Sequence, residues 1–585
     1  MRKLGTIVLT LVVVSLWIQL AACNREQPKE AQATTASASS STSYSSSAPR
    51  PPMEPAPSLG NNAWVLDQGW DNKLRELYWF TAQGSQVIPS SWLNALEHPP
   101  GPWPYSGRPF RDNTTFEYFR YLPATPTELN PDGWPLGFAI SKDPATGVEW
   151  FGYTCSGCHT GRVDYGGKSL IIDGGATMAD LVGFVQALLD AMNAILEPPP
   201  PRSPSFDRFA EKVLGTGYTS PAAAQLHGDV TALAAELETR KEGLLASGHA
   251  RLDAFGTIFN QVLGLDLGLA NNQKLADAAV SYPFIWDSSH SSLVQWNGAV
   301  SNNGIFPLAR NVAEFVGVFG QVDINPTRRP GYASSLNMNL LSDIESWLKQ
   351  LWSPLWPQDV LPPLDSAKIA RGQAHYQQYC ASCHPVINRT DPHRKIDVTM
   401  VKLKDIGTDP RMATNFSERM GQTGRLKGGK EFYLVGKELG DQAEGMSILN
   451  NVVAGVIFAH LKDAPKDVIK DFEGFYNTHR YNAITDPSYK ARSLNGIWAT
   501  APYLHNGSVP NLWEVLQPPE KRSDTFLAGS FRFDPVRVGF DITDTDRTTR
   551  FNASDVGSSN GGHGYGTTEL TDEQKWDLIE YLKSL

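Results

Sequence analysis

Two short segments of this chain combine cysteine and histidine in a pattern that can hold a redox cofactor. They are Cys155-Ser-Gly-Cys158-His159 and Cys380-Ala-Ser-Cys383-His384. In a C-x-x-C-H run, the two thiols can add to the vinyl groups of a haem and the adjacent imidazole can ligate its iron. We therefore predict two covalently bound haem c groups, with His159 and His384 as iron ligands.

Zinc binding, a dithiol redox pair and chance are the alternatives for each motif. A zinc site usually needs two more Cys or His ligands at matching spacing, and neither motif has such a pair nearby. A thioredoxin-like dithiol does not need the trailing His. The chain has five Cys, of which four lie in the motifs and the fifth is Cys23, so no thiol remains for a structural disulfide.

The N-terminus reads as a targeting segment. Met1-Arg-Lys is followed by an apolar stretch up to Leu20, and Leu20-Ala-Ala-Cys23 resembles a bacterial lipobox. An uncleaved membrane anchor is disfavoured, because the apolar run is short for a span of about 20 residues. We predict a signal peptide over 1–22, a lipidated Cys23 and a Ser/Ala/Pro-rich flexible tether over 23–60.

Charge and export together restrict the partners. The formal net charge is −10 and the isoelectric point is about 5.7, which argues against nucleic acid or anionic lipid as a main partner. The lipid anchor is then the only contact with a membrane. We predict an exported protein, anchored in the outer membrane and facing the periplasm or the cell exterior.

The elements around the second motif predict a C-terminal cytochrome c domain over 360–585. The residues from Asp365 to Cys380 read as a helix that leads into the motif. Thr571-Asp-Glu-Gln574 is a capping-box pattern that begins the last helix. We expect these two helices to cross closely, with Gly372 permitting the approach and Tyr581 filling the space beside it.

The N-terminal haem domain, over 61–359, is greatly enlarged relative to a minimal cytochrome c. Amphipathic helices are predicted near 176–196 and 229–254, with a loop over Pro198 to Pro204 between them. Sustained period-2 alternation is almost absent. The predicted fold class is therefore mainly α, with two cytochrome c-type haem domains and long irregular loops.

The segment from Arg492 to Ser508, which contains Thr500-Ala-Pro-Tyr-Leu-His-Asn-Gly-Ser508, resembles the signature of the bacterial di-haem cytochrome c peroxidase superfamily. Within that superfamily the chain most resembles the haem rubber oxygenases. The matching stretches, which are scattered over most of the chain, are Trp79–Pro89, Val294–Gly298, Pro307–Asn311, Ile406–Pro410 and Gly562–Gly566.

The resemblance implies that the two haems divide the work. The N-terminal haem keeps a sixth position open for oxygen or peroxide, and the C-terminal haem is six-coordinate and transfers electrons. No His follows His159 until His227, which is a departure from classical peroxidases. By the resemblance His563 is the second ligand of the C-terminal haem. Alternatives for that position are Met412, Met420 and Met446.

The resemblance also suggests roles for other side chains. His505 is expected near the haem edge, as a hydrogen-bonding group rather than an iron ligand. Arg492 and Arg310 could neutralise haem propionates. Trp286, Trp296 and Phe306 are candidates for the wall of the first haem pocket, against the alternative of ordinary aromatic core. The sequence does not determine whether calcium binds between the domains.

Three functions follow from this reading. The first is rubber oxygenase-like cleavage of an apolar alkene, small molecule or polymer, by oxygen at the His159 haem. The second is reduction of hydrogen peroxide there, with an acid–base group moving a proton and a redox-partner cytochrome supplying electrons. The third is a non-catalytic electron carrier. A carboxylate or His in the first haem pocket favours the peroxidase, an apolar lid the oxygenase, and a protein ligand the carrier.

Overall fold

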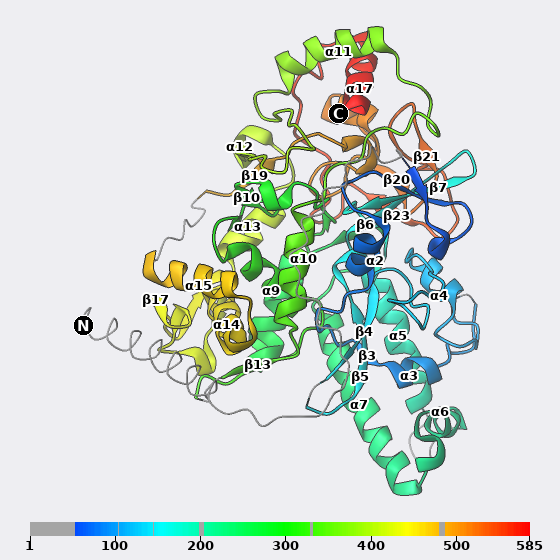
Figure 1. Cartoon of the computed structure of the whole chain (residues 1–585), viewed down its shortest axis with the longest axis vertical. Helices are drawn as coiled ribbons and strands as arrows, with labels where there is room; N and C mark the ends of the chain where they lie inside the picture. The colour runs from blue at the N-terminus through cyan, green and yellow to red at the C-terminus, as the bar shows by residue number, and fades with distance from the viewer. Residues whose placement is uncertain (1–52, 103, 144, 198–203, 328–330, 479–485) are drawn as a thin grey trace, which may run out of the picture. The chain divides into compact units, whose positions relative to one another are not determined.

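The computed structural model describes residues 53–585, apart from residues 103, 144, 198–203, 328–330 and 479–485 (Figure 1). The predicted signal peptide, the lipidated Cys23 and most of the predicted tether lie outside the described residues. The last part of that tether, Met53–Pro55, forms strand β1.

Helices and short strands alternate along the described chain. The helices are α2 Asn72–Phe80, α3 Ser90–Ala95, α4 Asn113–Tyr118, α5 Leu181–Leu196, α6 Pro204–Leu214, α7 Ser220–Glu242, α8 Ala254–Phe259, α9 Phe306–Gly317, α10 Met338–Leu348, α11 Ser366–Tyr379, α12 Leu403–Ile406, α13 Arg411–Glu418, α14 Gly445–His460, α15 Lys466–Thr478, α16 Leu512–Val515 and α17 Asp572–Ser584. The strands are β1 Met53–Pro55, β2 Ala63–Leu66, β3 Ile88–Pro89, β4 Phe138–Lys142, β5 Glu149–Tyr153, β6 Thr160–Tyr165, β7 Lys168–Asp173, β8 Arg251–Leu252, β9 Val280–Ser281, β10 Leu293–Val294, β11 Val300–Ser301, β12 Val322–Ile324, β13 Tyr332–Ser334, β14 Thr399–Lys402, β15 Met420–Gln422, β16 Lys430–Phe432, β17 Val435–Glu438, β18 Gln442–Glu444, β19 Ser488–Ala491, β20 Thr525–Ala528, β21 Phe533–Asp534, β22 Gly539–Phe540 and β23 Thr549–Asn552.

The prediction of a mainly α fold is wrong. Many small sheets accompany the helices, the largest with four strands in the order β1-β2-β7-β6 and the next with the order β3-β5-β4. All of the described strands except β4, β5, β6 and β7 contain only two to four residues, which is too short for a period-2 pattern to be recognised in the sequence. Strand β7 also ends in four consecutive buried residues, so it shows no alternation at all.

The first Cys-His motif connects the two largest sheets. It follows β5 of the three-stranded sheet and precedes β6 of the four-stranded sheet. A short 3₁₀ turn, Cys155–Gly157, carries its first cysteine. Because hydrogen-bonded strands hold both ends of this turn, the motif has a fixed position in the fold.

The two helices predicted in the N-terminal part are present, but their bounds differ from the predicted ones. The first is α5, which begins where Asp180 caps the backbone N–H of Gly183. The second, α7, begins at a Thr219 cap and ends at Glu242, well before the predicted residue 254. Helix α6 is absent from the prediction because its first residue, Pro204, falls in the predicted loop, although proline is tolerated at a first helical position. Residues 198–203 of that loop lie outside the described residues.

Helices α11 and α17 lie side by side and confirm the prediction for the second motif (Figure 1). A Cβ on Gly372 would meet the carbonyl oxygen of Asp577 at 2.0 Å, so only glycine fits this crossing. Tyr581 packs there against Tyr376, with ring centroids 5.1 Å apart. The Thr571–Gln574 capping box is also present. Helix α11 ends at Tyr379, directly before Cys380, and so positions the second motif.

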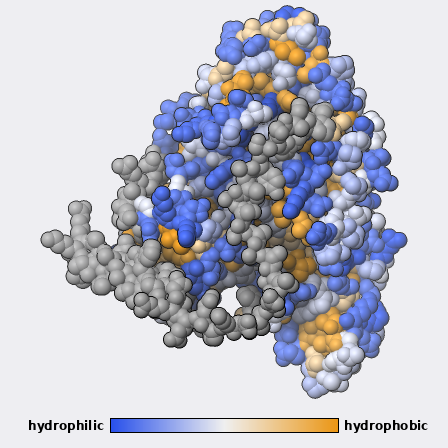
Figure 2. Space-filling view, viewed as in Figure 1, coloured by the Kyte–Doolittle hydropathy of each residue, from blue (hydrophilic) through white to orange (hydrophobic). Residues whose placement is uncertain are grey.

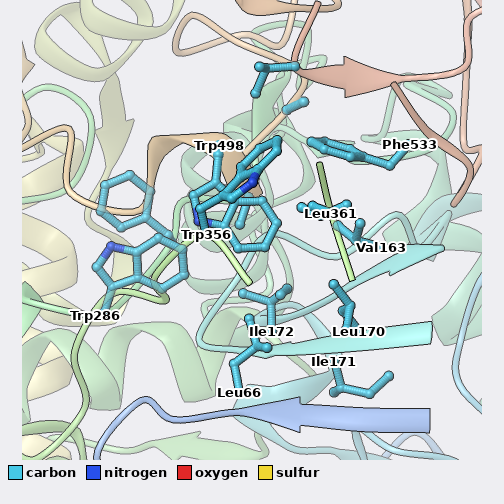
Figure 3. Close-up of a cluster of buried hydrophobic side chains, with 14 of the residues drawn as sticks. Leu66, Val163, Leu170, Ile171, Ile172, Trp286, Trp356, Leu361, Trp498 and Phe533 are labelled. Carbon is cyan, nitrogen blue, oxygen red and sulfur yellow. The ribbon is translucent and has the colours of Figure 1, made fainter. Parts of the chain in front are cut away.

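One hydrophobic core includes residues from both predicted haem domains. Trp286, Trp356, Trp498 and Phe533 pack in it together with strand residues such as Leu170 (Figure 3). Residues 51–585 accordingly form one compact unit. The boundary at 359/360 stays a prediction.

The segment Gly445–Asp463, which contains α14, is long and apolar enough to cross a membrane by length and composition, and 61% of its apolar window is buried. This burial is typical of the core helix of a globular protein. Polar and charged residues, by contrast, cover much of the surface in view, with scattered apolar patches (Figure 2).

Candidate functional site

The side chains of the first motif are neutral inside the protein. Desolvation raises the pKa of Cys155 and of Cys158 to about 12 and lowers that of His159 to about 4. Nδ1 of His159 lies 2.8 Å from the carbonyl oxygen of Pro283 and donates its proton there in the neutral tautomer. Nε2 is thereby left with a free lone pair, as a metal ligand requires.

A cavity lies beside this histidine. His159 and Cys158 line it, and its volume is about 110 Å³. Its apolar lining includes Leu181, Val185, Leu252, Phe255, Ile258, Val280, Tyr282, Trp296 and Phe319. A ligand-ready imidazole, a thiol and apolar walls are the surroundings that a covalently attached haem requires.

A carboxyl and an amide face the same cavity. Nε2 of Gln295 donates a hydrogen bond of 2.7 Å to Oε1 of Glu314, which lies on α9. Desolvation raises the pKa of Glu314, although Gln295 and Arg310 act in the opposite direction. Gln295 has a φ of +68°, a strained conformation for a residue with a side chain. The fold therefore holds a proton-exchanging group next to the His159 cavity.

Two partly buried cations of one segment, Lys490 and Arg492, lack an acidic partner among the described residues. Desolvation lowers the pKa of Lys490 well below its ordinary range and that of Arg492 to about 9. Among the described residues neither forms an ion pair with a carboxylate; Lys490 donates to the carbonyl of Leu293 and Arg492 to that of Phe284. Haem propionates are anions that would compensate this charge.

The structure pairs Arg310, the other predicted propionate ligand, with a carboxylate of the protein. Its Nη2 lies 2.7 Å from Oε2 of Glu345, and both side chains are buried. Arg310 therefore already has a counter-charge within the protein.

The second motif has the same arrangement as the first. Nδ1 of His384 lies 2.6 Å from the carbonyl oxygen of Arg492, which again leaves Nε2 for a metal. Desolvation lowers the pKa of His384 and raises that of Cys380 to about 11. Tyr376 of α11 donates its hydroxyl proton to the His384 carbonyl and so fixes the backbone of the motif.

His563 faces His384. Their ring centroids are 6.2 Å apart, with an angle of 56° between the planes. Two imidazoles that bind one metal from opposite sides, each with a metal–nitrogen distance of about 2.0 Å, have centroids roughly 6 Å apart. Nδ1 of His563 is buried with no hydrogen-bond partner among the described residues, and desolvation lowers its pKa to about 4. This pair fits the two axial positions of a six-coordinate haem.

A network of backbone contacts holds His563 in an unusual conformation. Its φ is +49°, and its N–H donates to the carbonyl of Ile406 at 2.8 Å. A Cβ on the preceding Gly562 would lie 2.2 Å from the carbonyl carbon of Gly407, so the two loops are in close contact. The buried Arg522 donates to the carbonyls of Asn560, Gly562 and His563. The loop at Ile406 and Gly407 and the side chain of Arg522 thus hold His563 in this strained backbone conformation.

The other predicted site residues lie in different places. Trp296 lines the His159 cavity, whereas Trp286 is fully buried in the main core (Figure 3) and Phe306 lines a neighbouring cavity. His505 is buried and stacks on Tyr489 at 3.9 Å, and its pKa falls to about 3 through desolvation.

The three methionines proposed as alternative ligands are also separated. Met412 lines the His159 cavity, Met420 is 48% exposed, and Met446 lines the neighbouring cavity with Phe306. Among the described residues, no group of three or more His, Cys, Asp or Glu could hold a metal ion.

Sequence reasoning missed four polar residues, namely Glu314, Gln295, Lys490 and Arg522. A signal existed for two of them. Glu314 follows Arg310 by one helical turn, and Lys490 precedes Arg492 by two residues in an extended segment, so both pairs share a face. Gln295 and Arg522 act through loop geometry, which has no sequence period.

Comparisons with known proteins agree with the cytochrome character of the site. A family model described as RoxA-like, cytochrome c-like matches residues 488–527, the segment with Lys490, Arg492 and Arg522. The uncharacterized protein y4iJ of Sinorhizobium fredii (strain NBRC 101917 / NGR234) is 31% identical over 587 residues, covering 90% of this chain and 94% of that protein. The uncharacterized protein y4iM of the same strain is 27% identical over 327 residues, covering 52% and 63%. The chain belongs to the family of y4iJ, and its RoxA-like cytochrome c domain marks it as an oxidoreductase that carries covalently bound haem c.

Proposed function

We propose that this protein is a di-haem oxidoreductase that reduces a peroxide at the His159 haem and receives electrons through the haem of His384 and His563. The observation that carries the proposal is the Glu314–Gln295 pair, which lines the cavity of His159. Heterolysis of a peroxide needs a group that moves a proton from one oxygen to the other. A carboxyl with a raised pKa in a largely apolar cavity suits that role.

When bound, the haem would supply the redox chemistry, and the side chains would supply position and proton transfer. His159 would hold the reactive iron from one side, with its imidazole oriented by the Pro283 carbonyl. Glu314 would take a proton from one peroxide oxygen and return it to the other, which leaves as water. Gln295 holds the carboxyl in place through its amide. The apolar wall limits the entry of water.

The two proximal histidines are joined by a short chain of hydrogen bonds. His384 donates to the Arg492 carbonyl, and the Arg492 guanidinium donates to the carbonyl of Phe284. Phe284 follows Pro283, the residue that binds His159. This connection supports transfer of electrons from the second haem to the first.

Cleavage of an apolar alkene by oxygen is the second candidate. It is favoured by the apolar lining around His159 and by the family match at residues 488–527. A protonatable carboxyl in the cavity speaks against it, because proton donors promote heterolysis of bound oxygen. If the protein is only an electron carrier, Met412 in the cavity wall is the candidate for a second protein ligand of the first haem.

One set of measurements separates these functions. A pyridine haemochrome assay should give two haems per chain, both resistant to organic extraction. The reduced protein should bind carbon monoxide at one haem, and it should consume hydrogen peroxide with reduced cytochrome c as donor. Glu314→Gln should lower kcat/KM for peroxide about 10²- to 10⁴-fold and leave carbon monoxide binding in place.

Other results of these measurements would assign one of the two alternative functions. Oxygen uptake with carbonyl products from polyisoprene, and no peroxide turnover, would assign the oxygenase. No carbon monoxide binding and no turnover would assign the carrier, and Met412→Leu should then open the first haem.

A further inference from the structure

A second cavity adjoins the His159 cavity and is lined mainly by hydrocarbon side chains. It lies among α8, α9, α14 and α15 and has a volume of about 70 Å³. Phe255, Ile258, Gln295 and Glu314 line both cavities. The carboxyl–amide pair therefore stands at the boundary between an apolar space and the space beside His159. We call this second space the alkyl cavity.

Small residues on two helices create the alkyl cavity. Ala309 and Ala313 are one turn apart on α9, and Ala454 lies on α14. Large apolar side chains form the rest of the wall; they include Phe306, Phe432, Leu449, Val453, Ile457, Phe472 and Phe475. A core that only had to pack would be expected to fill such a space, because an empty apolar cavity costs stability.

Among the described residues, four polar side chains line the alkyl cavity. They are Gln295, Arg310, Glu314 and Asn450. Gln295 and Glu314 bind each other, and Arg310 is paired with Glu345. Nδ2 of Asn450 is buried and has no hydrogen-bond partner among the described residues. An unused donor in an otherwise apolar wall suits a ligand that carries a single oxygen function on a hydrocarbon body.

We propose that the alkyl cavity binds the hydrocarbon chain of an organic hydroperoxide and presents its O–O–H group to Glu314. This inference rests on the proposed peroxide reduction and names its substrate class. The reaction is ROOH + 2 e⁻ + 2 H⁺ → ROH + H₂O. The O–O bond breaks, one oxygen stays on the carbon chain as an alcohol, and the other leaves as water. A reduced one-electron carrier protein supplies the two electrons in succession, and the solvent supplies the protons.

Substrate selectivity tests the proposal directly. The holoprotein is assayed with hydrogen peroxide, with a series of linear alkyl hydroperoxides and with cumene hydroperoxide, using reduced cytochrome c as donor. Each added methylene should raise kcat/KM up to about fourfold until the cavity is filled. Flat kcat/KM values across the series, with hydrogen peroxide reduced as fast as the alkyl substrates, would overturn the inference and leave the proposed function standing. No turnover of any peroxide would remove the proposed function itself.

A cavity-filling variant tests whether the alkyl chain of the substrate binds in the alkyl cavity. Ala309→Leu should raise the ratio of the KM for n-butyl hydroperoxide to the KM for hydrogen peroxide at least tenfold. Ala232→Leu, at an exposed position of α7, is the matched control and should leave the ratio unchanged. An unchanged ratio in Ala309→Leu would place the alkyl chain elsewhere and overturn the inference.

A binding measurement gives a readout without turnover. Butan-1-ol, the product of n-butyl hydroperoxide, should bind the oxidised holoprotein in calorimetry with a negative heat-capacity change. Ala309→Leu should weaken that binding, and Ala232→Leu should not. Wild-type protein that binds no butanol would count against the cavity as a hydrocarbon site, whatever its peroxide activity.

Discussion

The backbone carbonyl of Arg492 accepts a hydrogen bond from Nδ1 of His384 at 2.6 Å, while the guanidinium of Arg492 stacks 3.5 Å above the ring of Phe284, next to the residue that orients His159. One residue therefore contacts the surroundings of both motifs, through its main chain on one side and its side chain on the other. A substitution at this position can separate the two contacts, because it changes the side chain and keeps the carbonyl.

Arg492→Lys should disturb the haem of His159 more than that of His384. Lysine keeps a positive charge but cannot reproduce the guanidinium stacking on Phe284 or its hydrogen-bond geometry. We expect a shift in the midpoint potential of the first haem and slower electron transfer between the haems. Redox titration with stopped-flow absorbance measures both. Arg532→Lys, at a side chain that is 60% exposed, is the control. A change confined to the second haem would contradict this reading.

His563→Ala should convert the second haem from six- to five-coordinate, or admit water or a methionine. The two rings face each other at 6.2 Å, and this distance leaves room for one iron between them. Magnetic circular dichroism and electron paramagnetic resonance report the loss of the bis-histidine low-spin signal, and the first haem should keep its spectrum. His460→Ala, a histidine bonded to Ser334, is the control. A low-spin signal identical to wild type would show that His563 is not the ligand.

Arg522→Gln should loosen His563 without removing it. Arg522 holds three carbonyls of the His563 loop, and glutamine cannot reach all of them. The loss of hydrogen bonds from a buried charged donor should cost more than about 2 kcal/mol of stability. We expect a mixed low-spin and high-spin second haem, and partial recovery in Arg522→Lys. A destabilised protein with an unaltered low-spin spectrum would limit Arg522 to a structural role.

The residues that carry strong local signals were predictable from the sequence. The motifs, the Thr571 cap, the helix before Cys380 and the close approach at Gly372 each depend on neighbours in the chain or on one helix crossing. The structure also brings His563 to His384, as the family resemblance implied.

The polar centre beside His159 could not be predicted in the same way. Glu314 reaches the cavity from α9, and Gln295 meets it from a loop in a left-handed conformation, far from the first motif in the chain. Such a contact depends on tertiary packing, which no local pattern encodes. The small sheets were missed for a related reason, because strands of a few residues obtain their pairing from distant partners.

His505 should make stability fall in acid. Desolvation lowers its pKa from an ordinary value near 6.5 to about 3, so the unfolded chain binds a proton that the folded protein excludes. His505 adds no pH dependence to stability above pH 6.5, and its burial becomes destabilising as the pH falls toward 3. The effect reaches roughly 5 kcal/mol at most, at about 1.4 kcal/mol for each pH unit.

The measurement is the free energy of unfolding by denaturant between pH 7 and pH 4. The wild-type curve should fall more steeply toward acid than that of His505→Asn, which keeps a polar side chain against Tyr489 but cannot be protonated. His393→Asn, at an exposed position, is the matched control. Equal slopes for wild type and His505→Asn would mean that the folded protein admits the proton, and hence that the stacked pair is more open to water than its 6% exposure implies.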